Sequence, residues 1–274
     1  MLRLYLTIRK IINLLIMLAI LMLVLQLSAQ ENSNQWDAIE GDGTLRRIYV
    51  PILMYHYVSE LPPDADAIRT GLTLHPDIFR QHIQFLAENG YTSISLQDVD
   101  DALETGSELP ENPVILTFDD GYIDAYTDVF PILQSYNMIG TFFIITQFAD
   151  DNAQGYMNWS QINEMAQAGM NMEGHTKTHP TLIERELDFL VYEVIGSLES
   201  LNVHTGINSE MIAYPVGRYD ENTLRFMDST EIERAVTTEI GAYHTTDNRY
   251  QMMRLRITNE TGVAGLDYLL NYGR

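Results

Sequence analysis

Short apolar segments alternate with amphipathic segments from residue 52 to residue 257, and this alternation is the strongest constraint on the fold. Residues 114–116 and 140–146 are almost continuously apolar, as in strands that are covered on both faces. In segments such as 76–90, apolar side chains recur at helical spacing before Gly90. Strands that alternate with helices predict a parallel sheet, and closure into a barrel removes its open edges. We therefore predict an α/β barrel.

The same patterns give approximate element positions. A bend is expected at Pro131, because proline removes a helical hydrogen bond. The stretch 61–71 contains two adjacent prolines and is predicted to be a loop. We predict strands over 52–58, 92–95, 113–118, 140–146, 211–214, 235–238 and 253–257, and helices over 76–90, 96–105, 123–136, 160–168, 186–202 and 221–228.

Two polar motifs follow predicted strands. Asp119 and Asp120 end the strand over 113–118, and a turn at Gly121 can direct both carboxylates into one pocket. His175 and His179 are four residues apart, so one turn or a tight loop can aim both imidazoles at one point. Two imidazoles and one carboxylate form a facial site for a divalent ion, with a second carboxylate beside it as a general base. The combination predicts metal-assisted hydrolysis.

The sequences around these residues, TFDDGY at 117–122 and HTKTHP at 175–180, resemble the first two motifs of the polysaccharide deacetylase superfamily, carbohydrate esterase family 4. The resemblance is greatest to its poly-N-acetylglucosamine deacetylase branch and runs from about residue 50 to 257. It implies a distorted TIM-like (β/α) barrel with about seven parallel strands. Further segments that fit this branch are 50–57, 94–96, 140–143, Trp159, 213–217 and 235–238.

The resemblance also implies roles for individual residues. Asp119 would be the general base, while Asp120, His175 and His179 would hold the metal. Zinc is the simplest expectation for this ligand set, with cobalt, nickel or manganese as alternatives. A backbone N–H, that of Tyr122 or Val216, would stabilise the oxyanion together with the metal.

The chain departs from the family pattern in two places. The third motif usually begins with an arginine that orients the base, but Ala213 occupies this position. Arg254 is the predicted replacement, with Arg218 and Arg256 as alternatives. The fifth motif usually carries a histidine that protonates the leaving amine, and no histidine follows His244. His56, at the end of the first strand, is the predicted substitute, and His244 is the second choice.

Aromatic side chains are frequent in the motif loops, where their faces can stack on sugar rings. Trp159, Tyr214 and Tyr122 are the predicted substrate contacts among them. Any one of these residues could equally be an ordinary core or rim aromatic.

Composition restricts the partners. The net charge is −22 and the chain has only two lysines, so nucleic acids and anionic lipid headgroups are repelled. Such a surface serves solubility and would also tolerate a glucosamine polymer that becomes cationic as it loses acetyl groups. Cysteine is absent, which excludes disulfides and thiolate metal sites. We expect a monomer.

The N-terminus resembles an export signal. Arg3, Arg9 and Lys10 precede an apolar run over 11–27, and small residues follow before a polar stretch. We predict a signal peptide or an uncleaved membrane anchor over 1–29, a polar linker over 30–47 and a deacetylase domain over 48–274. The expected location is secreted or cell-surface, of the bacterial type.

The leading functional hypothesis is a metal-dependent hydrolase that removes N-acetyl groups from N-acetylglucosamine units of an extracellular polysaccharide. That substrate would be poly-N-acetylglucosamine, peptidoglycan or a chitin-like polymer, and its water would be activated by the metal and Asp119. One alternative is an O-acetyl esterase acting on xylan or another glycan, because the same machinery would serve. Another is a glycan-binding pseudoenzyme, given the missing arginine and histidine.

Overall fold

A computed structural model describes residues 42–272, and its compact unit begins at Gly43. Its main sheet has eight strands, of which the short β5 (Thr92–Ser93) pairs with β6 alone. The other seven close into a ring in the order β2-β12-β10-β9-β8-β7-β6, with β6 paired back to β2 and every pairing parallel. They are β2 (Ile52–Tyr55), β6 (Pro113–Phe118), β7 (Thr141–Ile144), β8 (Asn171–Gly174), β9 (Met211–Ala213), β10 (Arg234–Ile240) and β12 (Met252–Arg256). The predicted distorted barrel of about seven parallel strands is confirmed.

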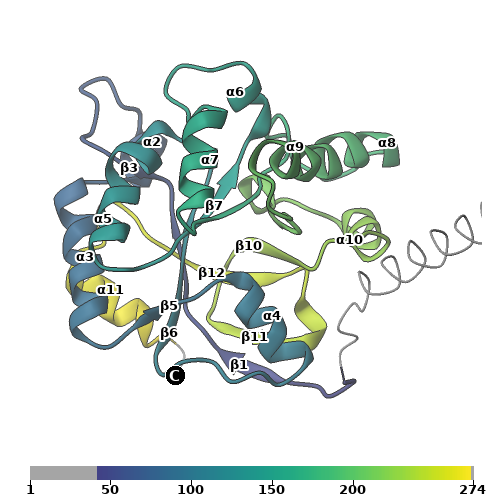
Figure 1. Cartoon of the computed structure of the whole chain (residues 1–274), viewed down its shortest axis with the longest axis horizontal. Coiled ribbons are helices and arrows are strands. Elements are labelled where there is room, and N and C mark those ends of the chain that lie inside the picture. Colours follow the sequence, from purple (N-terminus) through teal and green to yellow (C-terminus); the bar gives the residue numbers. More distant parts are fainter. Residues whose placement is uncertain (1–41, 273–274) are drawn as a thin grey trace, which may run out of the picture. The chain divides into compact units, whose positions relative to one another are not determined.

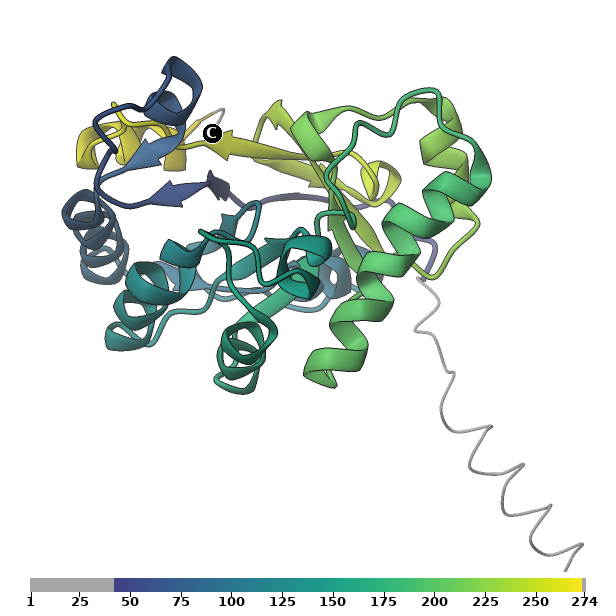
Figure 2. The same ribbon diagram turned by 90° about the horizontal axis from the view of Figure 1, so that it is seen from above.

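Burial explains why these segments form strands. Every residue of β2 and β7 is buried, because helices cover the sheet outside and side chains fill the barrel inside. The interior is packed by apolar residues from several strands, among them Ile52, Ile115, Phe143 and Met252. Figure 2 shows the yellow strand β12 near the purple N-terminal strands; β12 pairs with β2, and this pairing joins the two ends of the domain in the ring.

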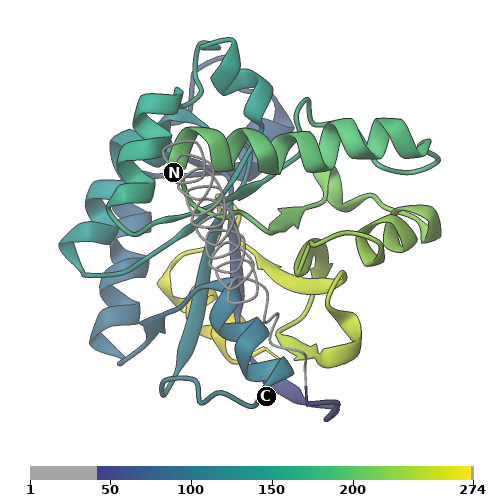
Figure 3. The ribbon, with the colours of Figure 1, turned by 45° about the vertical axis from the view of Figure 1, so that its right-hand side comes forward.

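Helices surround the barrel (Figures 1 and 3). Each of the longer ones buries one apolar face; α3, for example, buries Phe79, Ile83 and Leu86. The helix α11 packs beside α3 and was not predicted from the sequence. The helices are α2 (Ala67–Leu72), α3 (Pro76–Glu88), α4 (Leu96–Glu104), α5 (Phe130–Ser135), α6 (Thr146–Asp150), α7 (Trp159–Gln167), α8 (Leu187–Leu190), α9 (Gly196–Thr205), α10 (Glu221–Asp228) and α11 (Val263–Leu270).

The predicted helices over 123–136 and 186–202 each contain a wider π-helical turn. The first turn, Ala125–Val129, precedes α5 and its Pro131. Proline cannot donate a hydrogen bond and its ring clashes with the carbonyl four residues earlier, so a wider turn replaces the expected bend. The second turn, Val191–Ile195, lies between α8 and α9.

Two predictions near the N-terminal end of the domain were wrong. The expected strand over 52–58 is divided at His56 into β2 and β3 (Tyr57–Val58), and β3 pairs with β4 (Thr73–Leu74) instead of entering the barrel. The expected loop over 61–71 contains most of α2, which Asp66 caps by accepting a hydrogen bond from the Arg69 N–H at 2.7 Å. A further pair, β1 (Arg47–Tyr49) with β11 (Tyr243–Thr245), is antiparallel.

The predicted signal peptide or anchor over 1–29 and the linker as far as residue 41 lie outside the described residues. Between residues 42 and 272, no helix has both the length and the apolar character needed to cross a membrane.

Candidate active site

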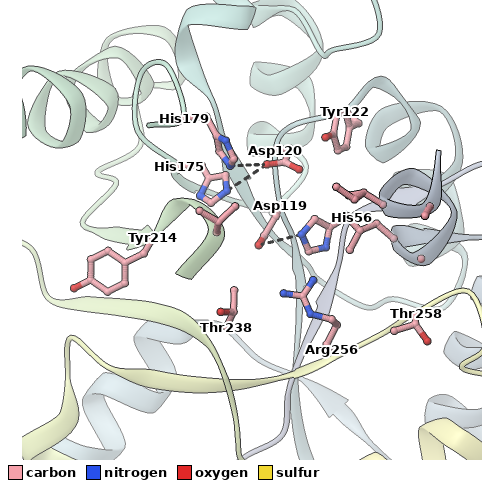
Figure 4. A pocket seen from close by; sticks show the side chains of 15 residues that line it. His56, Asp119, Asp120, Tyr122, His175, His179, Tyr214, Thr238, Arg256 and Thr258 are labelled. Atoms are coloured by element: carbon pink, nitrogen blue, oxygen red, sulfur yellow. Dashed lines mark ion pairs between the residues drawn. The ribbon is translucent and has the colours of Figure 1, made fainter. Parts of the chain in front are cut away.

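A pocket of about 650 Å³ opens at the carboxyl ends of the barrel strands (Figure 4). Asp119 and Asp120 follow β6, and His175 follows β8. In closed α/β barrels this end carries the chemistry, because loops from all the parallel strands converge there. The lining residues are His56, Ala67, Ile68, Gly71, Leu72, Asp119, Asp120, Tyr122, His175, His179, Tyr214, Val216, Thr238, Arg256 and Thr258.

The backbone after β6 turns sharply, and this turn brings both aspartates into the pocket. Asp120 has φ 76° and Gly121 has φ 75°, so two successive residues adopt left-handed conformations. For an aspartate this conformation is strained, and such strain is concentrated at functional sites. A side chain at Gly121 would also contact Ile144 at 3.3 Å. The turn that the sequence predicted at Gly121 therefore has a steric reason as well.

The three predicted metal ligands lie together. The Nε2 atoms of His175 and His179 are each 3.3 Å from Oδ1 of Asp120, and the ligand atoms all lie within 4.8 Å of one another. Nδ1 of His175 is 2.8 Å from the Ala213 carbonyl oxygen. Because that carbonyl can only accept, Nδ1 carries the proton and Nε2 is left as a free lone pair, as a metal ligand requires. The donor set therefore fits a divalent cation.

The loop that carries both histidines is held by Glu193, in the π-helical turn between α8 and α9. Its carboxylate accepts hydrogen bonds from the Thr178 N–H at 2.9 Å and the Thr178 hydroxyl at 2.6 Å. Its carbonyl accepts from the Lys177 N–H at 3.0 Å. π-helical turns are frequent at functional sites, and here the turn serves the geometry of the loop. Sequence reasoning did not find Glu193, because it is distant in sequence and belongs to a predicted helix.

His175→Ala should reduce bound divalent metal from about one ion per chain to nearly none, because it removes one of three protein ligands. Elemental analysis of the purified protein after dialysis measures this directly, without an activity assay. His204→Ala is the matched control, since His204 stacks on Trp159 and does not line the pocket. Equal metal content in wild type and His175→Ala would refute this ligand assignment.

Arg254 is paired with Asp119, as the sequence predicted. Its two terminal nitrogens donate to the two carboxylate oxygens at 2.7 and 2.8 Å, which is a bidentate ion pair. Further bonds to the Thr237 carbonyl and the Thr117 hydroxyl fix the guanidinium, and both partners are buried. Burial alone would raise the pKa of Asp119, but the charge and hydrogen bonds of Arg254 outweigh it and lower the pKa. Asp119 is thus ionised and immobile.

His56, between β2 and β3, is the histidine brought next to Asp119. Its Nε2 lies 3.9 Å from Oδ2 of Asp119 (Figure 4), and its buried Nδ1 has no hydrogen-bond partner in the described part of the chain. Burial lowers the pKa of His56 despite the opposing charges of Asp119 and Asp120, so the imidazole is neutral at neutral pH. The second choice, His244, does not line the pocket; it is buried, with Nε2 3.0 Å from the Val50 carbonyl oxygen.

The predicted oxyanion and substrate residues separate into two groups. Tyr122, Val216 and Tyr214 line the pocket, and Tyr122 stacks on Tyr57 with ring centres 3.6 Å apart. Trp159 does not line it: its ring stacks on His204 and its N–H donates to Asp150 at 2.9 Å.

The loop after β9 carries Val216 into the pocket. Val216 has φ 50° and Gly217 has φ 67°. Any side chain at Gly217 would lie 2.0 Å from the Thr238 hydroxyl, so only glycine allows this loop to approach β10.

Two parts of the pocket wall were not identified from the sequence. One is α2, whose residues Ile68 and Leu72 line the pocket. The other is Arg256, which was considered only as an alternative partner for Asp119. Residues two apart on a strand face the same side, so the placement of Arg254 would have indicated that of Arg256.

Comparison with known proteins identifies the family. The polysaccharide deacetylase profile matches residues 106–235. The Bacillus subtilis protein YxkH, which bears the name of a polysaccharide deacetylase, is 30% identical over 236 residues, covering 86% of this chain and 78% of that protein. The chain belongs to the polysaccharide deacetylase family. Polysaccharide deacetylases are hydrolases, so the predicted family and enzyme class are confirmed.

Two further relatives are informative. The structure of the Streptococcus pyogenes deacetylase PplD, in complex with acetate, superposes with a TM-score of 0.76 at 30% identity, over 82% of this chain and all of PplD. The poly-beta-1,6-N-acetyl-D-glucosamine N-deacetylase of Escherichia coli K12 is 30% identical over 127 residues, which is 41% of this chain and 19% of that enzyme.

Proposed function

We propose that this polysaccharide deacetylase is a metal-dependent hydrolase that removes N-acetyl groups from N-acetylglucosamine units of an extracellular polysaccharide. The observation that carries the proposal is the pairing of Arg254 with Asp119 directly beside the Asp120, His175 and His179 cluster. It provides an immobile base next to a cation site in one pocket. The E. coli relative, named for poly-beta-1,6-N-acetyl-D-glucosamine, supports this substrate class.

Asp120, His175 and His179 would hold the cation, for which zinc is the simplest choice. When bound, a divalent cation lowers the pKa of a water and polarises the acetamide carbonyl. Asp119 accepts a proton from the attacking water, and the pairing with Arg254 keeps its carboxylate ionised and aimed. The backbone N–H of Tyr122 or Val216 donates to the oxygen on which charge develops.

The leaving amine needs a proton when the C–N bond breaks. His56 lines the pocket and is the histidine next to Asp119, with its Nε2 3.9 Å from the carboxylate. We propose that His56 receives the proton taken up by Asp119 and passes it to the nitrogen. The water oxygen bonds to the acetyl carbon, the C–N bond breaks, and the products are the free amine and acetic acid, which ionises to acetate in solution.

The experiment that tests the function is acetate release from N-acetylglucosamine oligomers, measured before and after chelation and again after zinc is restored. We expect release that chelation abolishes and zinc restores. Acetylated xylan is the comparison substrate. Release from xylan alone would support an O-acetyl esterase, and release from neither substrate would support a glycan-binding pseudoenzyme.

We further propose that the segment over 1–29 directs export, so that the protein is secreted or anchored at the cell surface. We also propose that it acts as a monomer. Its net charge of −22 supports a carbohydrate partner over a nucleic acid.

His56→Ala should reduce turnover of N-acetyl substrates by about 100-fold, and turnover of an activated acetate ester much less. An amine cannot leave without a proton, whereas an activated alkoxide can. Steady-state kinetics on both substrates, with metal content verified, measures the difference. Equal losses on the two substrates would indicate a structural role for His56, and His244→Gln then tests the second histidine.

A further inference from the structure

Arg256, at the end of β12, is a cation in the active-site pocket without a partner among residues 42–272. It is half-buried and lines the pocket, where Figure 4 shows its guanidinium on the wall near Asp119 and His56. Within residues 42–272, the side chain of Arg256 forms neither an ion pair nor a hydrogen bond. A guanidinium that has lost part of its hydration without gaining an anion is costly.

The two fully buried arginines of the domain, by contrast, each have a carboxylate partner. Arg254 is paired with Asp119, and Arg234 is paired with Asp100 and Glu104. The chain has 38 acidic residues against 16 lysines and arginines, so carboxylates are abundant. The lack of a carboxylate beside Arg256 is therefore specific to this pocket and does not result from a shortage of acidic residues in the chain.

The carboxylates that line the pocket near Arg256 already interact with other side chains. Asp119 shares both oxygens with Arg254, and Asp120 lies between His175 and His179. Thr238 and Thr258, which also line the pocket, are neutral. Burial lowers the pKa of Arg256 from its ordinary value, which is consistent with a charge that lacks a full partner. An anion for Arg256 has to come from the ligand.

We propose that Arg256 binds a carboxylate carried by the polysaccharide, so that the preferred substrate is an N-acetylhexosamine polymer with acidic sugar units. This inference rests on the proposed function and specifies its substrate class. The planar guanidinium matches a carboxylate through two parallel hydrogen bonds. A protein with a net charge of −22 repels an acidic polymer at long range, so recognition of its carboxylates requires a cation inside the pocket.

The test compares two N-acetylglucosamine oligomers of equal length, one neutral and one with a carboxylate-bearing ether on alternate sugars. Kinetics are measured on the full, metal-loaded chain for wild type, Arg256→Gln and Arg256→Lys. We expect wild type to prefer the acidic oligomer, and Arg256→Gln to reduce the ratio of kcat/KM for acidic over neutral oligomer about tenfold or more. Arg256→Lys should restore part of the ratio. Arg225→Gln, an exposed arginine on α10 outside the pocket, is the matched control.

Amidation of the carboxylates on the acidic oligomer gives a test that needs no variant: wild type should lose its preference. Equal efficiency of wild type on both oligomers would overturn the proposal while leaving the deacetylase function intact. Weaker inhibition by acetate in Arg256→Gln, with no change in the acidic-to-neutral ratio, would overturn it in favour of product binding. A failure of wild type to release acetate from either oligomer would instead refute the proposed function.

Discussion

Asp119→Asn should abolish nearly all acetate release, by a factor of about 100 to 10,000, while leaving the metal content unchanged. The amide has almost the same shape as the carboxylate but cannot accept a proton from water. Asp119 is not among the three clustered ligands, whose atoms lie within 4.8 Å of one another. The measurement pairs acetate release with elemental analysis on the same preparation.

Asp120→Asn is the matched variant, because it makes the same change one residue further along the chain. It should lose metal as well as activity, since Asp120 lies 3.3 Å from both histidines. Metal loss in Asp119→Asn together with retention in Asp120→Asn would mean that the two aspartates have exchanged roles. Asp119→Asn also leaves Arg254 buried without a carboxylate, so thermal unfolding should be recorded for each variant.

The barrel and the cluster of Asp120, His175 and His179 could be predicted because they depend on local patterns. Continuous apolar segments such as β6 and β7 are buried on both faces, and that burial is what makes them strands of a parallel sheet. Motif residues directly after such strands lie at the same end of the barrel, and this does not depend on how many strands close it or in which order. The resemblance of the two motifs then gave Asp119, Asp120, His175 and His179 their roles.

The parts that were not predicted depend on contacts between segments distant in sequence. Glu193 positions the histidine loop through Thr178, and its backbone belongs to a π-helical turn that no apolar period reveals. The helix α2 has no buried residue, so it lacks an apolar face that could mark it, and Asp66 is its main local signal. Trp159 was expected in the pocket from its motif, whereas its ring packs on His204.

Arg254→Ala should lower turnover and move the acidic limb of the pH–rate profile to higher pH. Asp119 must be ionised to act as a base, so activity is lost as pH falls through its pKa. The charge of Arg254 holds that pKa below its ordinary value, while burial opposes this. Without the guanidinium the opposing effect of burial remains, the pKa rises, and a higher pH is needed to ionise the carboxylate.

The same variant should lose about 3–5 kcal/mol of stability at neutral pH, because Asp119 remains buried without its partner. The sign follows from the lowered pKa: the ion pair stabilises the folded state above the ordinary aspartate pKa, and this contribution disappears as the carboxylate is protonated. The difference between wild type and variant should therefore shrink at acidic pH in denaturant titrations. Arg254→Lys keeps the positive charge but not the bidentate geometry, so its acidic limb should lie between those of wild type and Arg254→Ala. An acidic limb that stays in place in Arg254→Ala would show that Arg254 does not control the ionisation of the base.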